Sequence, residues 1–249
     1  MNKKIIVVGG TSGLGRRLAE LYAAQGSMVG VIGRREELLT ELKNAYPKNI
    51  TVQKADVTNE DIGENLRKLI AGMGNVDTII ITASVAHLND EFHFQPEIDT
   101  ISLNVNGFGQ VLQTAWDYFK TRGSGQIVGV TSIAAIRGNK RAPAYHASKA
   151  FQSIYLESLR VKAKHEKNGI IVTELIPGYI DTQMGKGNRL FWVASLKKAG
   201  RQSKRAIDNK RKRVFITKRW WFVYTFLKWI PGSIYVPLVN GSWKLKQKN

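Results

Sequence analysis

The pattern that most constrains the fold of this chain is a regular alternation of short β-branched runs with longer helical segments. Strands are predicted at residues 4–9, 28–32, 50–54, 77–82, 126–131, 170–176 and 213–217. Helices are predicted between them at 14–25, 35–45, 59–72, 96–121 and 143–167. Several strands are apolar on consecutive positions, which is typical of strands buried on both faces. The sequence therefore predicts an α/β fold, a doubly wound parallel sheet of Rossmann type with about seven strands and helices on both faces.

The first predicted strand runs directly into a glycine-rich turn, GGTSGLG, which opens the next predicted helix. Residues without a Cβ let the backbone turn tightly and approach a bound group closely. The helix that starts here points free N–H groups and the positive end of its dipole toward that group. This setting favours a dinucleotide pyrophosphate site over a plain glycine turn. The predicted binding residues are Gly9, Thr11, Ser12, Gly13, Leu14 and Gly15.

The second predicted strand is followed by two arginines where a fold specific for NAD usually has an acidic residue. A guanidinium binds a ribose 2′-phosphate through paired, charge-assisted hydrogen bonds, whereas an acid would repel it. Arg34 and Arg35 therefore favour NADP(H) as the cofactor. The alternative is that both arginines are the solvated start of the helix at 35–45. Asp56 after the third strand has two open interpretations, an acceptor for the adenine amino group or a helix N-cap.

A second group of polar residues falls in the middle of the chain. Tyr145 and Lys149 are four residues apart in a predicted helix, so they share one face. An ammonium about 5 Å from a phenol, at an effective dielectric near 20, favours phenolate by roughly 3 kcal/mol, or about two pK units. The phenol is thereby expected to become a general acid. Ser132 is predicted at the C-terminal end of the strand 126–131, where such sheets bind ligands.

In order and spacing, these residues resemble the signature of the short-chain dehydrogenase/reductase family. The narrower resemblance is to its single-domain, NADP(H)-dependent branch, and it covers roughly residues 3 to 184. The matching motifs are Gly9-xxx-Gly13-x-Gly15, Asp56-Val57, Asn106, Ser132, Tyr145-xxx-Lys149 and Pro177-Gly178.

The resemblance implies an NADPH-dependent carbonyl reductase, or an alcohol dehydrogenase in the reverse direction, that acts on a ketone or secondary alcohol. Tyr145 is then the general acid/base, Ser132 orients the carbonyl oxygen, and Lys149 tunes Tyr145 and holds the nicotinamide ribose. Asn106 positions a water that relays protons to Lys149. Thr182 contacts the nicotinamide carboxamide. The other implied cofactor contacts are Arg34, Arg35, Asp56, Val57, Ala83, Ser84, Tyr145, Lys149, Pro177, Gly178 and Ile180. A non-catalytic NADP(H)-binding sensor or membrane-recruitment protein is the alternative function.

One stretch departs from the family pattern. After the fourth strand the family usually carries Asn-Asn-Ala-Gly, whereas this chain has Ile81-Thr82-Ala83-Ser84. Ala83 and Ser84 are still small enough for close cofactor approach. Thr82 is expected to replace part of the asparagine that braces the sheet.

Other chemistries fit the sequence less well. A serine hydrolase needs a G-x-S-x-G elbow, and the chain reads GVTSIAA around Ser132. The four histidines lack the spacing of a metal site, and the chain has no cysteine, so no metal is expected. The histidines are predicted to be structural, with His87 or His93 the better candidates to line a pocket and His146 the poorer one.

Charge is concentrated at the C-terminal end of the chain. Residues 1–180 contain 21 Lys and Arg against 17 Asp and Glu, whereas residues 181–249 contain 17 against 2. We therefore expect one domain with two parts. Residues 1–185 are predicted to form the dinucleotide-binding and catalytic core. Residues 186–249 are predicted to form a substrate lid, the last strand and a basic, aromatic extension.

The predicted lid contains Leu190, Phe191, Val193 and Ala194, which would suit an apolar substrate or simply pack in the core. For the basic, aromatic stretch 197–239, the interpretations left open are contact with an anionic membrane surface, an oligomer interface and a plain basic face. A transmembrane helix is disfavoured because Lys228, Pro231 and Gly232 interrupt the apolar run. Nucleic-acid binding is not expected because no such motif is present. The chain is expected to be cytoplasmic, peripheral on the inner face of a membrane if the tail binds it, and a homo-oligomer, dimer or tetramer.

Overall fold

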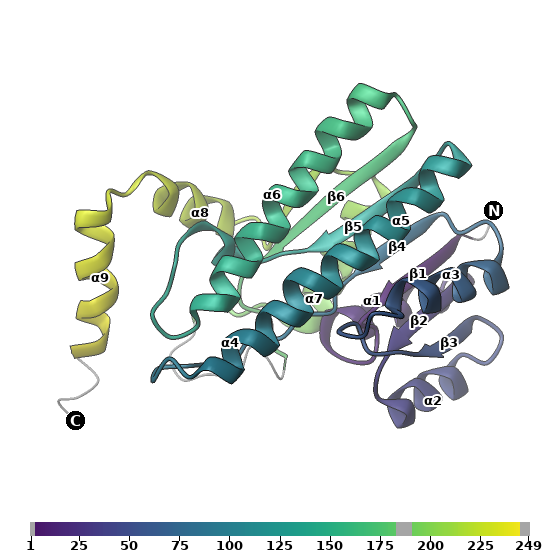
Figure 1. The fold of residues 1–249 in the computed structure, drawn as a ribbon, viewed down its shortest axis with the longest axis horizontal. Coiled ribbons are helices and arrows are strands. Elements are labelled where there is room, and N and C mark those ends of the chain that lie inside the picture. Colours follow the sequence, from purple (N-terminus) through teal and green to yellow (C-terminus); the bar gives the residue numbers. More distant parts are fainter. Residues whose placement is uncertain (1–2, 183–190, 245–249) are drawn as a thin grey trace.

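A computed structural model of the chain describes residues 3–182 and 191–244 (Figure 1). Seven parallel strands form one sheet in the order β3-β2-β1-β4-β5-β6-β7. The strands are β1 Lys4–Val8, β2 Met28–Gly33, β3 Ile50–Lys54, β4 Thr78–Ile81, β5 Gly125–Val130, β6 Ile170–Pro177 and β7 Arg213–Ile216. The predicted doubly wound Rossmann sheet is confirmed, and each strand lies within about two residues of its predicted range.

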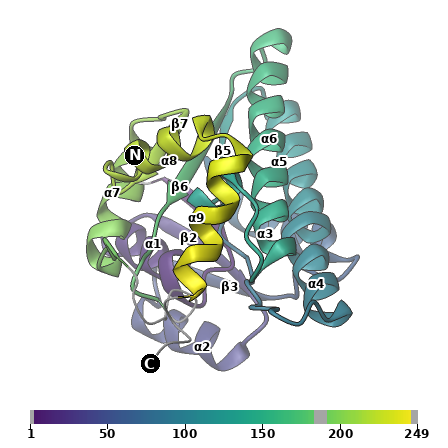
Figure 2. The ribbon, with the colours of Figure 1, turned by 90° about the vertical axis from the view of Figure 1, so that its left-hand side faces the viewer.

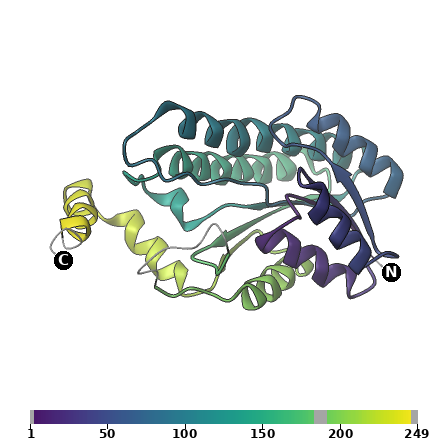
Figure 3. The same cartoon turned by 90° about the horizontal axis from the view of Figure 1, so that it is seen from below.

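Helices cover both faces of the sheet (Figure 3). They are α1 Gly13–Ala23, α2 Glu36–Ala45, α3 Ile62–Met73, α4 Phe94–Ile101, α5 Phe108–Arg122, α6 Pro143–Glu166, α7 Leu196–Asp208, α8 Trp220–Trp229 and α9 Gly232–Lys244. One core joins the sheet to α3, α5 and α6, and a second core joins its other face to α1, α2 and α7. In β1, Ile6 and Val8 enter the first core while Ile5 and Val7 enter the second. This alternation explains why the strand is apolar at consecutive positions.

The segment predicted as one helix at 96–121 contains a change of helical type. It consists of α4, a π-helical stretch Ser102–Gly107 and α5. A π-helix forms i→i+5 hydrogen bonds and therefore changes which side chains face the sheet. At its end, a Cβ on Gly107 would lie 2.3 Å from the Val57 carbonyl oxygen, so this glycine lets the helix approach the loop after β3.

The chain leaves the sheet after β7 and continues into two helices, α8 and α9, which we call the C-terminal arm. Figure 1 shows the arm extending away from the sheet, and Figure 2 shows α9 crossing in front of the carboxyl ends of the strands. Among the helices within residues 3–182 and 191–244, none combines the length and apolar character that crossing a bilayer requires. The arm is therefore two short helices, of 10 and 13 residues, joined at Pro231.

Candidate active site

A large cleft opens at the carboxyl ends of the strands, with a volume of about 1330 Å³. Parallel α/β sheets bind their ligands at this edge. Every residue predicted to bind cofactor or to act in catalysis lines this cleft, with the single exception of Asn106. They are Gly9, Thr11, Ser12, Gly13, Leu14, Gly15, Arg34, Arg35, Asp56, Val57, Ala83, Ser84, Ser132, Tyr145, Lys149, Pro177, Gly178, Ile180 and Thr182.

The glycine turn between β1 and α1 is closely packed against β4. Gly9 has a φ of +87°, and a Cβ there would lie 2.5 Å from the Ala83 nitrogen. A Cβ on Gly15 would lie 2.4 Å from the Thr82 hydroxyl oxygen. That hydroxyl bonds the carbonyl oxygens of Val8 and Gly9 at 3.0 and 3.1 Å. Thr82 thus joins the turn to the next strand, which is the bracing role expected for it.

The two arginines after β2 lie at the end of the cleft nearest the glycine turn. Arg35 donates to the hydroxyls of Thr11 and Ser12 at 3.0 and 2.9 Å, which holds its guanidinium beside the turn. Arg34 lies 3.6 Å from the Asp56 carboxylate and remains largely exposed. Burial opposes ionisation of Asp56, but bonds from Thr58 and the charge of Arg34 lower its pKa below the usual value. Both arginines are placed to meet an anion that enters this end of the cleft.

Asp56 begins a local turn rather than a helix. Its Oδ1 accepts hydrogen bonds from the Thr58 amide at 3.0 Å and hydroxyl at 2.8 Å. Helix α3 starts only at Ile62. The N-cap interpretation of Asp56 is therefore wrong, and its carboxylate lines the cleft next to Val57.

Ser132, Tyr145 and Lys149 gather at the other end of the cleft. Ser132 follows β5, where its Oγ caps the next turn by accepting from the Ala134 amide at 3.1 Å. The Tyr145 phenol is carried by the first turn of α6, and its interaction with Ser132 favours the ionised form of the phenol by lowering its pKa. Lys149 Nζ, one helical turn further, lies 5.7 Å from the centre of the Tyr145 ring. The predicted spacing thus places a hydroxyl, a phenol and an amine around one point.

Burial controls the ionisation of this cluster. Lys149 is 2% exposed, and burial lowers its pKa to about 7. Burial also raises the pKa of Tyr145 above its usual value, although the hydrogen bond from Ser132 opposes this. The expected lowering of the phenol pKa by Lys149 is therefore not seen, because desolvation of both groups outweighs their attraction. Burial therefore favours the neutral amine of Lys149 and the neutral phenol of Tyr145 over their charged forms.

Asn106 does not lie in the cleft. Its side chain is exposed, whereas Asn104, two residues earlier in the π-helical stretch, is fully buried. Two positions apart on a helix point in nearly opposite directions, so only one of the two asparagines in LNVNG can face the site. The Asn104 side chain accepts from the Val85 amide and the Ser84 hydroxyl, and it donates to the Val85 carbonyl and the Ser148 hydroxyl. Of the two asparagines, it is therefore Asn104 and not Asn106 that contacts residues next to the site.

Replacing the two asparagines should separate these positions. Asn104→Ala should destabilise the protein by about 3 kcal/mol or more, because it leaves several buried partners without a hydrogen bond. Asn106→Ala, at an exposed position, should change the free energy of unfolding by less than about 0.5 kcal/mol. Chemical denaturation of both variants measures this difference. Equal effects of the two substitutions would contradict this placement of the two asparagines.

Two further residues, Gln152 and His146, lie next to the site, and neither was assigned a role there from the sequence. Gln152 accepts a 2.9 Å hydrogen bond from Lys149 Nζ and donates at 2.8 Å to the Asn104 carbonyl. His146 lines the cleft, with Nδ1 2.6 Å from the Arg137 carbonyl oxygen. His87 and His93 do not line it, so the expected order of the histidines is wrong. Gln152 reaches the π-helical stretch and His146 reaches the loop after Ser132, and sequence spacing does not reveal such contacts between elements.

The wall of the cleft comes from an unexpected part of the chain. Phe191 and Val193 of the predicted lid are half-exposed and do not line the cleft, while Ala194 packs in the core and Leu190 lies outside the described residues. The C-terminal arm supplies the wall instead. The lining residues of the arm are Leu227, Tyr235, Leu238 and Val239.

A parallel sheet with a phosphate-type glycine turn and a Ser–Tyr–Lys cluster at one edge defines the class of Rossmann oxidoreductases. A profile of the family described as short chain dehydrogenase matches residues 3–190. An uncharacterized oxidoreductase of Mycobacterium tuberculosis is 35% identical over 192 residues, which cover 73% of this chain and 75% of the relative. The chain therefore belongs to the short-chain dehydrogenase family and is an oxidoreductase.

Solved structures show the same fold over the whole length of the chain. A short-chain dehydrogenase from Streptomyces avermitilis has a TM-score of 0.75 at 23% identity, over 99% of this chain and 94% of that one. A short-chain dehydrogenase from Sphingobium yanoikuyae, in complex with NADPH, has a TM-score of 0.76 at 17% identity, over 99% and 96%. At these identities the likeness supports the fold alone.

Proposed function

We propose that this protein is an NADP(H)-dependent carbonyl reductase, or alcohol dehydrogenase, that moves hydride between the cofactor and a ketone or secondary alcohol. The observation that carries the proposal is the cluster of Ser132, Tyr145 and Lys149 at the opposite end of one cleft from Arg34 and Arg35. A dinucleotide spans such a distance, with its phosphates at one end and its reactive ring at the other. The NADPH held by the Sphingobium yanoikuyae structure is consistent with this choice of cofactor.

The cleft fits a dinucleotide phosphate. A Cβ at Gly9 or Gly15 would collide with Ala83 or Thr82, so glycine is needed for the turn to adopt this path, and the turn lines the cleft. The amide groups that begin α1 supply donors for the pyrophosphate. Arg34 and Arg35 would bind a 2′-phosphate, and Pro177 to Thr182 would line the nicotinamide end. When bound, the cofactor supplies or accepts the hydride.

The residues of the chain handle the substrate oxygen and its proton. Ser132 and Tyr145 both line the substrate end of the cleft, so a carbonyl oxygen placed between their hydroxyls would accept from both. Tyr145 would then donate its phenolic proton as the carbon is reduced. Lys149 Nζ, held by Gln152 and the Val130 carbonyl, stabilises negative charge that develops on the phenol oxygen. Lys149 and Ser132 are buried and Tyr145 is half-buried, and this reduced exposure to water strengthens these interactions.

The substrate side of the cleft favours an apolar molecule. Leu227, Leu238 and Val239 from the arm face the loop Ile133–Ile136 that follows Ser132. Apolar walls of this kind bind alkyl or ring surface by burial. We therefore propose a lipophilic ketone or alcohol as substrate. We further propose that the enzyme works in the cytoplasm as a homodimer or homotetramer, with the membrane contact argued below.

A panel of carbonyl compounds tests the proposed activity. The purified protein should oxidise NADPH with lipophilic ketones faster than with small polar ones, as measured by the loss of absorbance of the reduced cofactor. Binding of NADPH without turnover across the panel would favour the alternative, a non-catalytic sensor.

Ser132→Ala should test the role of the hydroxyl separately. Removal of one donor to a reacting oxygen typically costs 10²–10³-fold in kcat, so we expect a loss of about that size. The affinity for NADPH should stay unchanged, because Ser132 lies at the substrate end. Thr131→Ala is not a fair control, since Thr131 bonds the buried Glu174. Ser124→Ala, at the far end of β5 and away from the cleft, is a better one and should keep full activity.

A further inference from the structure

The outer face of the arm carries a stripe of exposed aromatic side chains. Phe222, Phe226 and Trp229 lie at positions i, i+4 and i+7 of α8, so they form one stripe. They are 67%, 64% and 77% exposed. A soluble chain rarely exposes so much contiguous apolar surface without a contact to cover it. The opposite face of the same helix contributes Leu227 to the cleft and the fully buried Trp220 to the body.

The sequence that carries this stripe contains only positive side-chain charge. No Asp or Glu follows Asp208 in the sequence, while residues 209–239 contain seven Lys and Arg. Lys218 precedes Phe222 by one helical turn, and Lys228 lies beside Trp229. An apolar stripe with a purely basic border matches the interface of a bilayer that contains anionic lipids.

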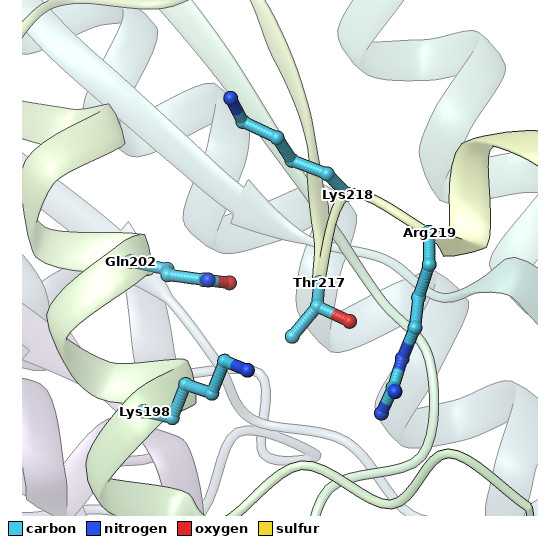
Figure 4. A pocket seen from close by; sticks show the side chains of 5 residues that line it. All are labelled: Lys198, Gln202, Thr217, Lys218 and Arg219. Carbon is cyan, nitrogen blue, oxygen red and sulfur yellow. The ribbon is translucent and has the colours of Figure 1, made fainter.

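A basic pocket lies at the root of the arm, between α7 and the end of β7, with a volume of about 250 Å³ (Figure 4). Its lining residues are Lys198, Gln202, Thr217, Lys218 and Arg219. Thr217 is 5% exposed, and within the described part of the chain its hydroxyl has no hydrogen-bond partner. Arg219 donates from one nitrogen to the Trp192 carbonyl, but its Nε has no partner among the same residues. The pocket thus offers buried donors and cationic side chains to an anion.

The arm is tied to the loop that follows Ser132. Arg137 donates to the Leu227 carbonyl at 2.8 Å and also to the Ile230 carbonyl. The Tyr235 hydroxyl donates to the Gly138 carbonyl at 2.7 Å. These contacts fix the inner face of the arm over the cleft while its outer face stays exposed. A surface that binds the outer face would therefore lie next to the substrate end of the cleft.

We propose that the C-terminal arm lies on an anionic lipid bilayer, with the aromatic stripe in the interface and a lipid phosphate in the basic pocket, and that lipophilic substrate enters the cleft from the bilayer. The arm is suited to lie on the surface, since α8 and α9 are too short to cross it. The last part of this proposal rests on the proposed function, whereas the docking itself does not.

Vesicle sedimentation of the full-length protein tests the docking. The protein should bind phosphatidylcholine vesicles that contain phosphatidylglycerol and should bind pure phosphatidylcholine far more weakly. Replacing Phe222, Phe226 and Trp229 by serine should weaken binding by about a hundredfold or more. Lys198→Ala and Lys218→Ala should each weaken it about fivefold, and added salt should mimic their effect.

Control variants at exposed positions outside the arm show whether removal of any apolar or basic side chains from the surface weakens vesicle binding. Phe151, Ile154 and Val161 are exposed on α6, and their replacement by serine should leave vesicle binding unchanged. Lys48→Ala with Lys164→Ala is the basic control. Failure of the wild type to bind either vesicle, or an equal loss in the α6 variant, would overturn the proposal. Dissociation of an oligomer by the stripe variant, seen in sedimentation velocity, would instead assign the stripe to a second copy of the chain.

Turnover separates this proposal from the proposed function. With a water-soluble ketone and no vesicles, the stripe variant should match the wild type, because its substitutions lie outside the cleft. With a lipophilic ketone dissolved in anionic vesicles, the stripe variant should be slower by about the same factor as its loss of binding. Absence of all turnover in the wild type would refute the reductase and leave the sedimentation result standing.

A separate observation concerns the neighbour of Lys149. The Gln152 amide links Lys149 Nζ to the Asn104 carbonyl of the π-helical stretch, and Gln152 is fully buried. We infer that Gln152 is a positioning residue, which holds the Lys149 ammonium at its working place and stabilises its charged form. A neutral acceptor within hydrogen-bond reach favours the ammonium over the amine.

The pH profile of kcat/KM tests this role. The charged form of Lys149 is lost as pH rises through about 7, so kcat/KM should fall above that pH. Gln152→Leu should move this basic limb to lower pH and reduce kcat about tenfold, whereas Gln152→Glu should move it to higher pH. A purely packing role would lower activity in both variants without moving the limb, and that result would overturn the inference.

Discussion

Tyr145→Phe should reduce kcat by about 10³-fold, within the range that general acid catalysis contributes. The substitution removes only the hydroxyl, which lines the cleft beside Ser132, and keeps the ring in the first turn of α6. The proton would then have to come from water. Consumption of NADPH at saturating ketone measures the change.

Two measurements make this result specific. The dissociation constant of NADPH, from the fluorescence of the bound cofactor, should stay unchanged in Tyr145→Phe. Tyr155→Phe on the same helix is the matched control, since Tyr155 packs against the core and does not line the cleft. Full activity in Tyr145→Phe would end the assignment of Tyr145 as the acid.

Replacement of both Arg34 and Arg35 by serine should raise the KM for NADPH by about a hundredfold. Two charge-assisted hydrogen bonds to a phosphate contribute roughly 3 kcal/mol together, which corresponds to that factor. The KM for NADH should change little, because NADH has no 2′-phosphate. Asp56, left without Arg34, would add repulsion toward the phosphate.

Comparison of the KM values for NADPH and NADH shows whether the double variant loses a contact to the 2′-phosphate. Arg67→Ser removes one exposed arginine from α3, outside the cleft, and should leave both KM values unchanged. An equal rise in KM for NADPH and NADH in the double variant would point to damage of the turn, which Arg35 holds through Thr11 and Ser12. A wild type that prefers NADH would contradict the prediction directly.

The sheet and most of the cleft could be predicted from sequence because their causes are local. A strand buried on both faces must be apolar at consecutive positions, and a tight turn must be rich in glycine. Tyr145 and Lys149 share a face through the helical period alone. Position 9 must be glycine for a similar reason, because a Cβ there would collide with Ala83.

The parts that sequence did not predict depend on long-range packing. A one-residue widening of the helix at Ser102–Gly107 decides whether Asn104 or Asn106 faces inward, and the sequence contains both. The pKa of Tyr145 depends on its burial in the folded protein. The four-residue spacing of Tyr145 and Lys149 carries no information about that burial. The arm forms the wall because Arg137 captures two of its carbonyls across ninety residues of sequence or more.

Arg137 also marks the junction between two parts of the molecule, the sheet with its helices and the C-terminal arm. Tyr145, Lys149 and the glycine turn belong to α6 and to the β1–α1 connection, whereas the arm that lines part of the cleft is joined to the body by one connection after β7. Exchange of residues 220–244 for the corresponding segment of a relative should therefore change part of the lining of the cleft without interrupting any strand of the sheet. In such a chimera, Arg137 would have to be kept, because it donates to the Leu227 and Ile230 carbonyls and so holds the arm over the cleft. The arm is therefore a unit that can be exchanged while the sheet stays unchanged.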